Sequence, residues 1–265
     1  MAEIYLYVSA AFRALDEHAL FDRLSPLFHV SRRQNNNSSA SPTKVELSAR
    51  LHRLCNIKEK ELSGRGVIPP PILHICHGLE TAAMQFAQQA LLHPHISRMA
   101  RAEFLNNIRR RSVFRIWRYH RGVGCRPHYD PGLCTALLLP SPTSGLEVNL
   151  QQSLPSVPGR PGNYRYDEAE QKNKVDSLPG WTAPTSPKEE DDTLVLSGDM
   201  MRVLSNNALP AVLHRVRDDW ATGSETVRYS FVLELRPAEP QRWYKLAQQQ
   251  QKEKEEEEEG CLTKE

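Results

Sequence analysis

The 265-residue sequence lacks the features of a membrane-embedded or exported protein. No run approaches the ~18 uninterrupted apolar residues that a membrane-spanning helix needs. The opening residues are apolar, but an acidic residue stands where a signal peptide has basic ones, and charges return at Arg13 and Asp16. We therefore expect neither a membrane partner nor a signal peptide.

Neither sign of charge is in large excess. The sequence has 34 Lys and Arg against 32 Asp and Glu, a formal net charge of +2. This balance argues against a generally basic nucleic-acid binder, so we expect no nucleic-acid partner. Cysteines are also few, because the five of them are scattered and form no Cys-x-x-Cys pair. Reduced thiols, and hence a cytoplasmic location, are the expectation for such a chain.

The first part of the chain, residues 1–110, is predicted to be a mostly helical N-terminal region. Apolar residues recur at helical spacing in four segments, which are 11–30, 44–62, 78–92 and 95–110. A polar stretch at 31–43, rich in Asn and Ser, has almost nothing to bury and predicts a low-complexity loop.

Residues 111–240 change to a pattern of short strands. The predicted strands are Val113–Tyr119, Thr135–Leu139, Gly145–Leu150, Thr193–Leu196, Met201–Leu204, Val212–Val216 and Arg228–Leu235. Between them, residues 151–190 have no periodicity and predict a long surface insertion. Many short strands without alternating helices favour a sandwich, jelly roll or barrel. Residues 241–265, with runs of Gln and Glu, predict a charged tail that is disordered or a solvated helix.

Three residues of this strand-rich part are candidate metal ligands: His128 and Asp130 in Pro-His-Tyr-Asp-Pro, and His214 in Leu-His-Arg-Val. Positions i and i+2 of an extended segment point to the same face, so His128 and Asp130 can present an imidazole and a carboxylate to one ion. A third ligand must come from another strand, and His214 stands in a strand-like apolar run. Two neutral imidazoles and one carboxylate suit Fe(II) that binds O2 and a chelating co-substrate at its open positions.

A candidate anion-binding pair begins fourteen residues after His214. Arg228 and Ser230 again stand at i and i+2. A planar guanidinium can bind a carboxylate through two hydrogen bonds, and a neighbouring hydroxyl can donate a third. Upstream, Tyr119 ends an alternating strand, and its phenol could reach the same carboxylate.

These motifs give the sequence a resemblance to the 2-oxoglutarate-dependent Fe(II) oxygenase superfamily, specifically to its isopenicillin-N-synthase-like branch of plant-type dioxygenases. Similar motifs occur in the same order across residues 113–237. They are Phe114–Tyr119, Pro127–Gly132, Thr135–Leu139, Gly145–Val148, Ser197–Asn206, His214–Val216 and Arg228–Ser230. The resemblance implies an α+β fold class, with a double-stranded β-helix (jelly roll) core after the helical N-terminal region.

The resemblance also implies site residues and a reaction. The implied iron ligands are His128, Asp130 and His214. The residues implied to hold the far carboxylate of 2-oxoglutarate are Arg228, Ser230 and Tyr119. The implied enzyme is a dioxygenase that uses Fe(II), 2-oxoglutarate and O2 to hydroxylate or desaturate a small organic substrate, with release of succinate and CO2. No catalytic residue beyond the metal ligands is expected.

The sequence departs from the family pattern at Trp117, where the family commonly has Asn. Two alternative functions stay open: a catalytically inactive β-helix binding module and a protein or peptide hydroxylase. Nucleic-acid demethylation is less favoured, because that branch has a second Arg six residues after the first and this chain has Glu234 there. A zinc site is also not favoured at the other clustered histidines, because no Cys pair completes it; they are His74, His77, His93 and His95.

Overall fold

A computed structural model describes residues 28–33, 44–51, 70–94, 108–138, 145–151, 179–184, 193–219 and 227–237, together with Leu54, Ile96, Lys245 and Gln249. For nine residues of these ranges it describes the backbone and not the side chain: Val30, Arg32, Arg33, Lys44, Val45, Pro70, Pro71, Val227 and Arg228.

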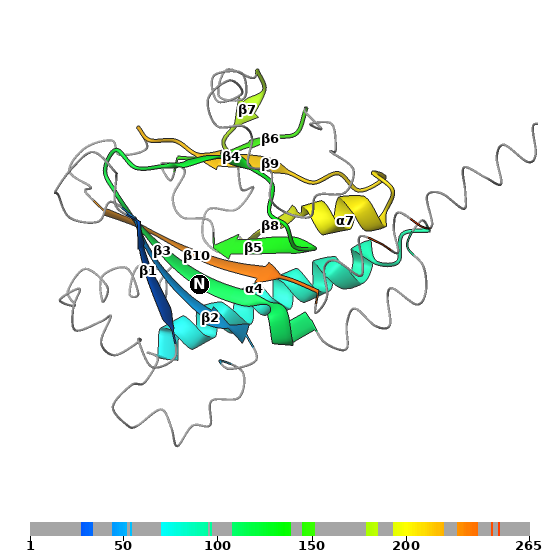
Figure 1. The fold of residues 1–265 in the computed structure, drawn as a ribbon, viewed down its shortest axis with the longest axis horizontal. Coiled ribbons are helices and arrows are strands. Elements are labelled where there is room, and N and C mark those ends of the chain that lie inside the picture. The colour runs from blue at the N-terminus through cyan, green and yellow to red at the C-terminus, as the bar shows by residue number, and fades with distance from the viewer. Residues whose placement is uncertain are drawn as a thin grey trace, which may run out of the picture.

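Two antiparallel sheets face each other in the molecule (Figure 1). Their strands are β1 His29–Arg33, β2 Lys44–Arg50, β3 Val113–His120, β4 Cys125–His128, β5 Cys134–Leu138, β6 Leu146–Asn149, β7 Trp181–Thr182, β8 Thr193–Ser197, β9 Leu213–Val216 and β10 Val227–Leu235. The larger sheet has the order β1-β2-β3-β10-β5-β8, and the smaller has the order β4-β9-β6-β7. From β3 to β10 the chain passes back and forth between the sheets, which confirms the predicted jelly-roll core.

Helix α4, Pro70–Ala90, covers the outer face of the larger sheet (Figure 1). It begins with prolines, whose missing N–H is harmless in a first turn that has no internal acceptor for it. Its buried residues recur three or four positions apart and form one stripe: Ile72, Ile75, Cys76, Leu79, Ala83 and Ala87. This stripe packs on β5, β8 and β10. The helix predicted at 78–92 is therefore confirmed, although it begins earlier.

Side chains of the larger sheet alternate between this helix and the space between the sheets. On β10, the odd-numbered residues from Phe231 to Leu235 belong to the main hydrophobic core with α4. The even-numbered ones from Ser230 to Glu234 line a cavity instead. Strand β5 is buried on both faces, which explains its continuous apolar run.

The prediction of a mostly helical N-terminal region is wrong at two places. Residues 44–50, expected to begin a helix, form β2 between β1 and β3. Leu47 and Ala49 are buried there while Glu46 and Ser48 are half-buried, so burial alternates with the period of two that is typical of a strand. In so short an apolar run, periodicity alone does not separate a strand from a helix. Residues 29–33 form β1, although 29–30 were expected to end a helix and 31–33 to begin a loop. The rest of that loop and most of the helices predicted at 11–30 and 95–110 lie outside the described residues.

Helix α7, Asp199–Leu204, replaces the strand predicted at Met201–Leu204. Its first residue pairs with Arg202 one turn later, with Arg202 Nη2 at 2.6 Å from Asp199 Oδ1. The two asparagines that follow have positive φ angles of 50° and 64°, the left-handed conformation that often ends a helix. These end signals favour a helix, whereas the four apolar residues of the segment alone do not decide between a helix and a strand.

The predicted insertion at 151–190 contains β7, which pairs with β6 at the edge of the smaller sheet. The remaining residues of the insertion, 152–178 and 185–190, lie outside the described residues, as does the predicted tail apart from Lys245 and Gln249. No helix in the described ranges is both long and apolar enough to cross a membrane.

The turn before α7 packs against the segment that carries Asp130. Three consecutive backbone N–H groups, from Gly198 to Met200, donate hydrogen bonds of 2.8–3.1 Å to carbonyls within residues 130–133. The backbones approach so closely that a Cβ on Gly198 would lie 2.2 Å from the carbonyl oxygen of Gly132. This contact holds the loop between β4 and β5 in place.

We expect Gly198→Ala to lower the free energy of unfolding by about 3 kcal/mol, the upper end of the usual overpacking range, because the added methyl group meets backbone atoms. Gly122→Ala is the control. Gly122 has a φ of +78° but no atom within 4 Å of an added Cβ. Backbone strain of about 1 kcal/mol is the expected effect there. Denaturant unfolding measures both variants, and equal stability of Gly198→Ala and the unaltered chain would contradict the close contact.

Candidate metal centre

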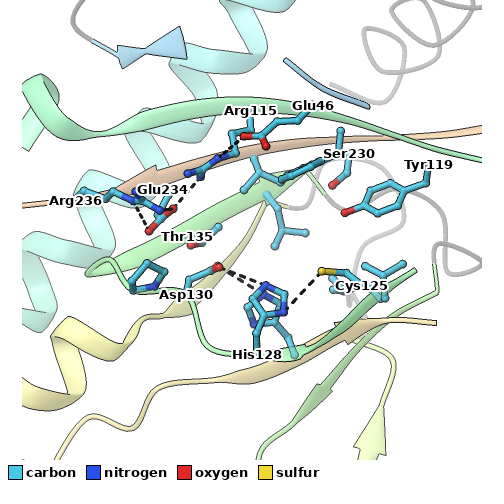
Figure 2. A pocket seen from close by; sticks show the side chains of 17 residues that line it. Glu46, Arg115, Tyr119, Cys125, His128, Asp130, Thr135, Ser230, Glu234 and Arg236 are labelled. Atoms are coloured by element: carbon cyan, nitrogen blue, oxygen red, sulfur yellow. Dashed lines mark hydrogen bonds and ion pairs between the residues drawn. The ribbon is translucent and has the colours of Figure 1, made fainter. Parts of the chain in front are cut away.

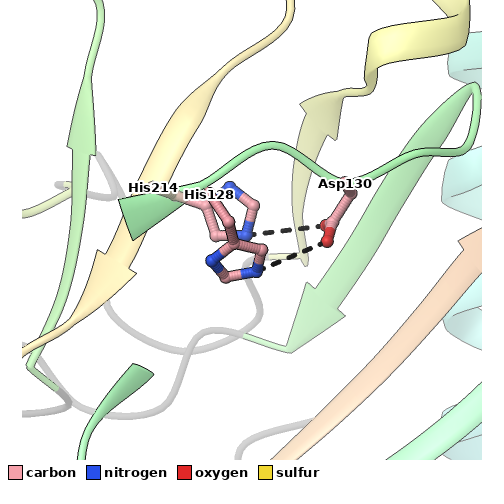
Figure 3. A group of neighbouring side chains, drawn as sticks. All are labelled: His128, Asp130 and His214. Carbon is pink, nitrogen blue, oxygen red and sulfur yellow. Dashed lines mark ion pairs between the residues drawn. The ribbon is translucent and has the colours of Figure 1, made fainter. Parts of the chain in front are cut away.

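Three side chains from two segments of the chain meet at the side of the cavity between the sheets (Figure 3). His128 is the last residue of β4, and Asp130 follows it in the loop to β5. His214 lies on β9, directly opposite His128 in the backbone ladder. One ligand atom from each residue lies within 4.8 Å of the others, so the group could hold a metal ion. The structure thus brings together the three residues that the sequence pattern singles out.

Both imidazoles turn their Nε2 atoms toward Asp130. His128 Nε2 lies 3.6 Å from Asp130 Oδ1, and His214 Nε2 lies 3.6 Å from Asp130 Oδ2. These distances are too long for hydrogen bonds. Atoms that share a metal at about 2.1 Å stand roughly 3–3.5 Å from each other. The spacing is therefore close to that of a ligand set around one ion.

The second nitrogen of each ring binds a backbone carbonyl two positions earlier in the chain. His128 Nδ1 lies 2.7 Å from the carbonyl oxygen of Arg126, and His214 Nδ1 lies 3.1 Å from that of Val212. Because a carbonyl oxygen only accepts hydrogen bonds, each Nδ1 carries the proton that it donates. Each Nε2 is then the nitrogen that faces the shared site, the arrangement that metal-binding histidines normally have.

The charges of the three residues favour a cation at their centre. Burial lowers the pKa of His214, and the charge of His128 acts in the same direction. Burial also lowers the pKa of His128, but Cys125, Asp130 and the carbonyl of Arg126 outweigh it and raise the pKa to about 9. Burial alone raises the pKa of Asp130, yet the two histidines bring it below its ordinary value. The carboxylate is therefore ionised at neutral pH, and an arriving metal ion displaces the proton of His128.

A cavity of about 250 Å³ adjoins the three residues (Figure 2). Its volume lies below the range of about 300–1,000 Å³ that is usual for drug-sized ligands, so it suits a small molecule. Apolar side chains from both sheets line it; they include Leu137, Leu146, Val216 and Val232. Trp117, which stands where the family commonly has Asn, is a wall of this cavity as well.

Two of the three residues predicted to hold a carboxylate also line the cavity. Tyr119 and Ser230 are both buried and lie on the neighbouring strands β3 and β10. Arg228 is opposite Tyr119 in the ladder of these strands, and its side chain lies outside the described residues. The backbone therefore brings Arg228 beside Tyr119, while its contact with a ligand stays a prediction.

The donor set fits a metal that keeps open coordination positions. Two imidazoles and one carboxylate approach from one side, and the cavity lies on the other. Thr135, on the cavity wall, has a buried hydroxyl without a hydrogen bond of normal geometry among the described residues, although it is near enough to Asp130 to lower the pKa of that carboxyl. A polar group left without a partner in such a place is what a bound ligand would satisfy.

The histidines of α4, Asp199 and Cys134 belong to no second metal site in the described part of the chain. No other group of metal-ligating side chains converges there as the three do, and His74 and His77 are exposed on α4. Asp199 pairs with Arg202 and does not line the cavity. Burial raises the pKa of the Cys134 thiol, which is a small side chain of the hydrophobic core.

Four charged residues on the cavity wall were not predicted from the sequence: Glu46, Arg115, Glu234 and Arg236. Glu46 lies in the segment 44–62, whose apolar spacing favoured a helix. Arg115 alternates with Trp117 and Tyr119 along β3, so the period of two was a signal that could have found it.

No protein-family model matches the chain, and no curated protein matches it significantly. Several solved structures do align with it. A protein from Shewanella oneidensis, provisionally described as an oxygenase, aligns over 89% of this chain and 76% of its own, with 18% identity and a TM-score of 0.51. A protein from Caulobacter crescentus, provisionally described as a 2OG-Fe(II) oxygenase family member, aligns over 88% and 72%, with 17% identity and a TM-score of 0.47. A dioxygenase for auxin oxidation from rice aligns over 90% and 71%, with 19% identity and a TM-score of 0.48.

Of these three, the Shewanella structure alone has a TM-score above 0.5, and at 18% identity it shows a shared fold. The resemblance to the oxygenase superfamily is confirmed at the level of the fold. The branch within the superfamily stays a prediction.

We expect His214→Ala to lower the affinity for Fe(II), or for Co(II) as its stand-in, by more than about 100-fold. Losing an outer-shell partner of a ligand already costs about 10–100-fold, and this variant loses a ligand itself. Anaerobic calorimetric titration measures the affinity. His74→Ala, which removes an exposed histidine of α4, is the matched control and retains the metal. Loss of the metal in His74→Ala together with its retention in His214→Ala would show that the metal binds at the histidines of α4 and not at the candidate centre.

Proposed function

We propose that the chain is an Fe(II)- and 2-oxoglutarate-dependent dioxygenase that oxidises a small organic molecule and releases succinate and CO2. The observation that carries the proposal is the convergence of His128, Asp130 and His214 beside a small cavity, with the Nε2 atoms of both imidazoles turned toward the carboxylate. The fold shared with a protein described as an oxygenase is consistent with it.

In this proposal the three side chains hold Fe(II) from one side and leave its remaining positions toward the cavity. The bound iron and 2-oxoglutarate supply the oxidising chemistry, in which O2 is activated as the oxo acid loses CO2. The carbonyls of Arg126 and Val212 keep the proton of each imidazole on Nδ1. Asp130 adds a negative charge that lowers the net charge of the loaded centre.

We assign the far carboxylate of 2-oxoglutarate to Arg228, Ser230 and Tyr119. The hydroxyls of Tyr119 and Ser230 line the cavity from neighbouring strands, so both can donate to one carboxylate. The guanidinium of Arg228 has the planar fork that binds a carboxylate through two hydrogen bonds. Its place opposite Tyr119 in the ladder supports this role.

The apolar walls of the cavity limit the access of water to the reacting centre. Leu137 and Val232 from the larger sheet, and Leu146 and Val216 from the smaller one, enclose the space beside the metal ligands. A dry site strengthens the interactions of the charged groups inside it and prevents side reactions. A volume of about 250 Å³ favours a small substrate over a folded protein surface.

The proposal predicts that the purified chain forms succinate from 2-oxoglutarate in the presence of Fe(II) and O2, slowly even without a substrate. Arg228→Ala is expected to weaken the binding of 2-oxoglutarate by about 10- to 100-fold, since a hydrogen bond to a charged group contributes about 1.5–3 kcal/mol. The same variant keeps its iron. Succinate formation, 2-oxoglutarate titration and metal content measure the three quantities.

Arg217→Ala is the control for this variant, because Arg217 is an exposed arginine that pairs with Asp219 and does not line the cavity. It should behave like the unaltered chain. Loss of iron in Arg228→Ala would contradict the separate roles of the two groups. A chain that binds Fe(II) and 2-oxoglutarate but releases no succinate would instead be the inactive binding module.

A further inference from the structure

Four charged side chains form a connected network on the cavity wall that belongs to the larger sheet (Figure 2). Arg115 is central: its Nε donates to Glu46 Oε1 at 3.1 Å and its Nη1 to Glu234 Oε2 at 2.8 Å. Arg236 donates from Nε and Nη2 to the two oxygens of Glu234, at 2.7 Å each. The four residues come from β2, β3, β10 and the position after β10, so folding of the sheet assembles them.

Stability alone does not explain this network. The side chain of Glu234 is 2% exposed, and charged groups lose their hydration when they are buried. Apolar residues of similar volume in place of a buried ion-pair network are often neutral or stabilising. Apolar residues do occur on the same cavity wall, for example Val232, so the position itself does not require charged groups. A role in ligand recognition accounts for charged groups at this place.

Two members of the network keep unused hydrogen-bonding capacity. Among the described residues, Arg115 Nη2 has no partner and Glu46 Oε2 has none, while both residues line the cavity. One is a donor and the other an acceptor. The buried hydroxyl of Thr135, which lies between the network and Asp130 in Figure 2, also lacks a hydrogen bond of normal geometry within the described part of the chain.

The charges of the network limit what it can bind. Its two carboxylates balance its two guanidinium groups, so it has no net charge to attract an ion. A ligand carboxylate would compete with Glu46 and Glu234 for Arg115, and Asp130 would repel it as well. A ligand ammonium would compete with Arg115 for Glu46. A neutral ligand with both a donor and an acceptor disturbs none of these pairs.

We propose that this network recognises the substrate, and that the substrate is a small uncharged molecule with a hydrogen-bond acceptor beside a donor, as in an amide, a lactam or a ureide. Its carbonyl accepts from Arg115 Nη2, and its N–H donates to Glu46 Oε2. Thr135 supplies a further hydrogen bond on the side of the metal ligands. The inference rests on the proposed function for the position of the reacting metal.

Four ring compounds of similar size test the proposal by binding to the full chain saturated with Co(II) and 2-oxoglutarate, so that the metal centre and the assigned carboxylate site are already filled. They are δ-valerolactam, with a donor beside an acceptor; cyclohexanone, with an acceptor alone; cyclohexanecarboxylate, an anion; and cyclohexylammonium, a cation. Ligand-observed NMR titration measures each dissociation constant. We expect the lactam to bind at least about fivefold more tightly than the other three, because it alone satisfies both free groups without opposing a charge.

Glu46→Gln is the variant that removes the hydrogen-bond acceptor at this position while keeping the size and shape of the side chain. Its amide oxygen still accepts from Arg115, so its NH2 group is left facing the N–H of the lactam. We expect the lactam to bind about fivefold more weakly to this variant, since a charged acceptor is replaced by a donor. Cyclohexanone, which has no N–H, should bind equally to the variant and to the unaltered chain.

Glu147→Gln is the matched control. The side chain of Glu147 is 14% exposed against 17% for Glu46, and it also pairs with an arginine, 2.7 Å from Arg215 Nε. It does not line the cavity. Lactam binding should therefore be unchanged in Glu147→Gln.

Equal affinity of the lactam for Glu46→Gln and for the unaltered chain overturns the proposal, and so does tighter binding of either charged compound. If Glu46→Gln does not fold, the preference of the unaltered chain among the four compounds decides. If the chain forms succinate but does not prefer the lactam, the network does not recognise the substrate, and the proposed dioxygenase function is unaffected. If the chain prefers the lactam, in a way that depends on Glu46, but forms no succinate, the ligand site is supported and the proposed dioxygenase function is contradicted.

Discussion

The direct pairing of β4 with β9 is the constraint on which the candidate centre depends. In this ladder His128 stands opposite His214, so two residues 86 positions apart in the sequence are brought to one face of the smaller sheet. A slip by one residue would turn one imidazole to the other face. The third group, Asp130, is held separately, through the hydrogen bonds between the turn before α7 and the loop after β4. One contact therefore sets the nitrogen ligands, and another sets the oxygen ligand.

The larger sheet separates core packing from the cavity wall by its two faces. Its outer face packs on α4 in an apolar core, while its inner face has hydroxyls, charged groups and aromatic rings around the cavity. Because side chains alternate along each strand, both tasks are carried by consecutive residues such as Leu233 and Glu234. The polar inner face is tolerated because the outer face already buries large side chains such as Phe114 and Phe231.

Much of the jelly roll, and the pair of His128 and Asp130, could be predicted from local patterns in the sequence. His214 was singled out through the order of motifs that resembles the oxygenase superfamily, because its convergence with the other two depends on the distant pairing of β4 with β9. The strand at Thr135 is a continuous apolar run, and His128 and Asp130 share the i, i+2 spacing of an extended segment. Glu46 could not be found in this way, since its position on the cavity wall depends on the pairing of β2 with β3, a contact distant in sequence. Helix α7 was missed because its apolar run is too short to have a distinct period.

Each imidazole of the candidate centre is oriented by a main-chain oxygen two positions earlier in the chain. Every amino acid provides that atom. Positions 126 and 212 can therefore change during divergence without turning either ring, as long as the strands persist. Such a centre is robust to sequence drift at these two positions.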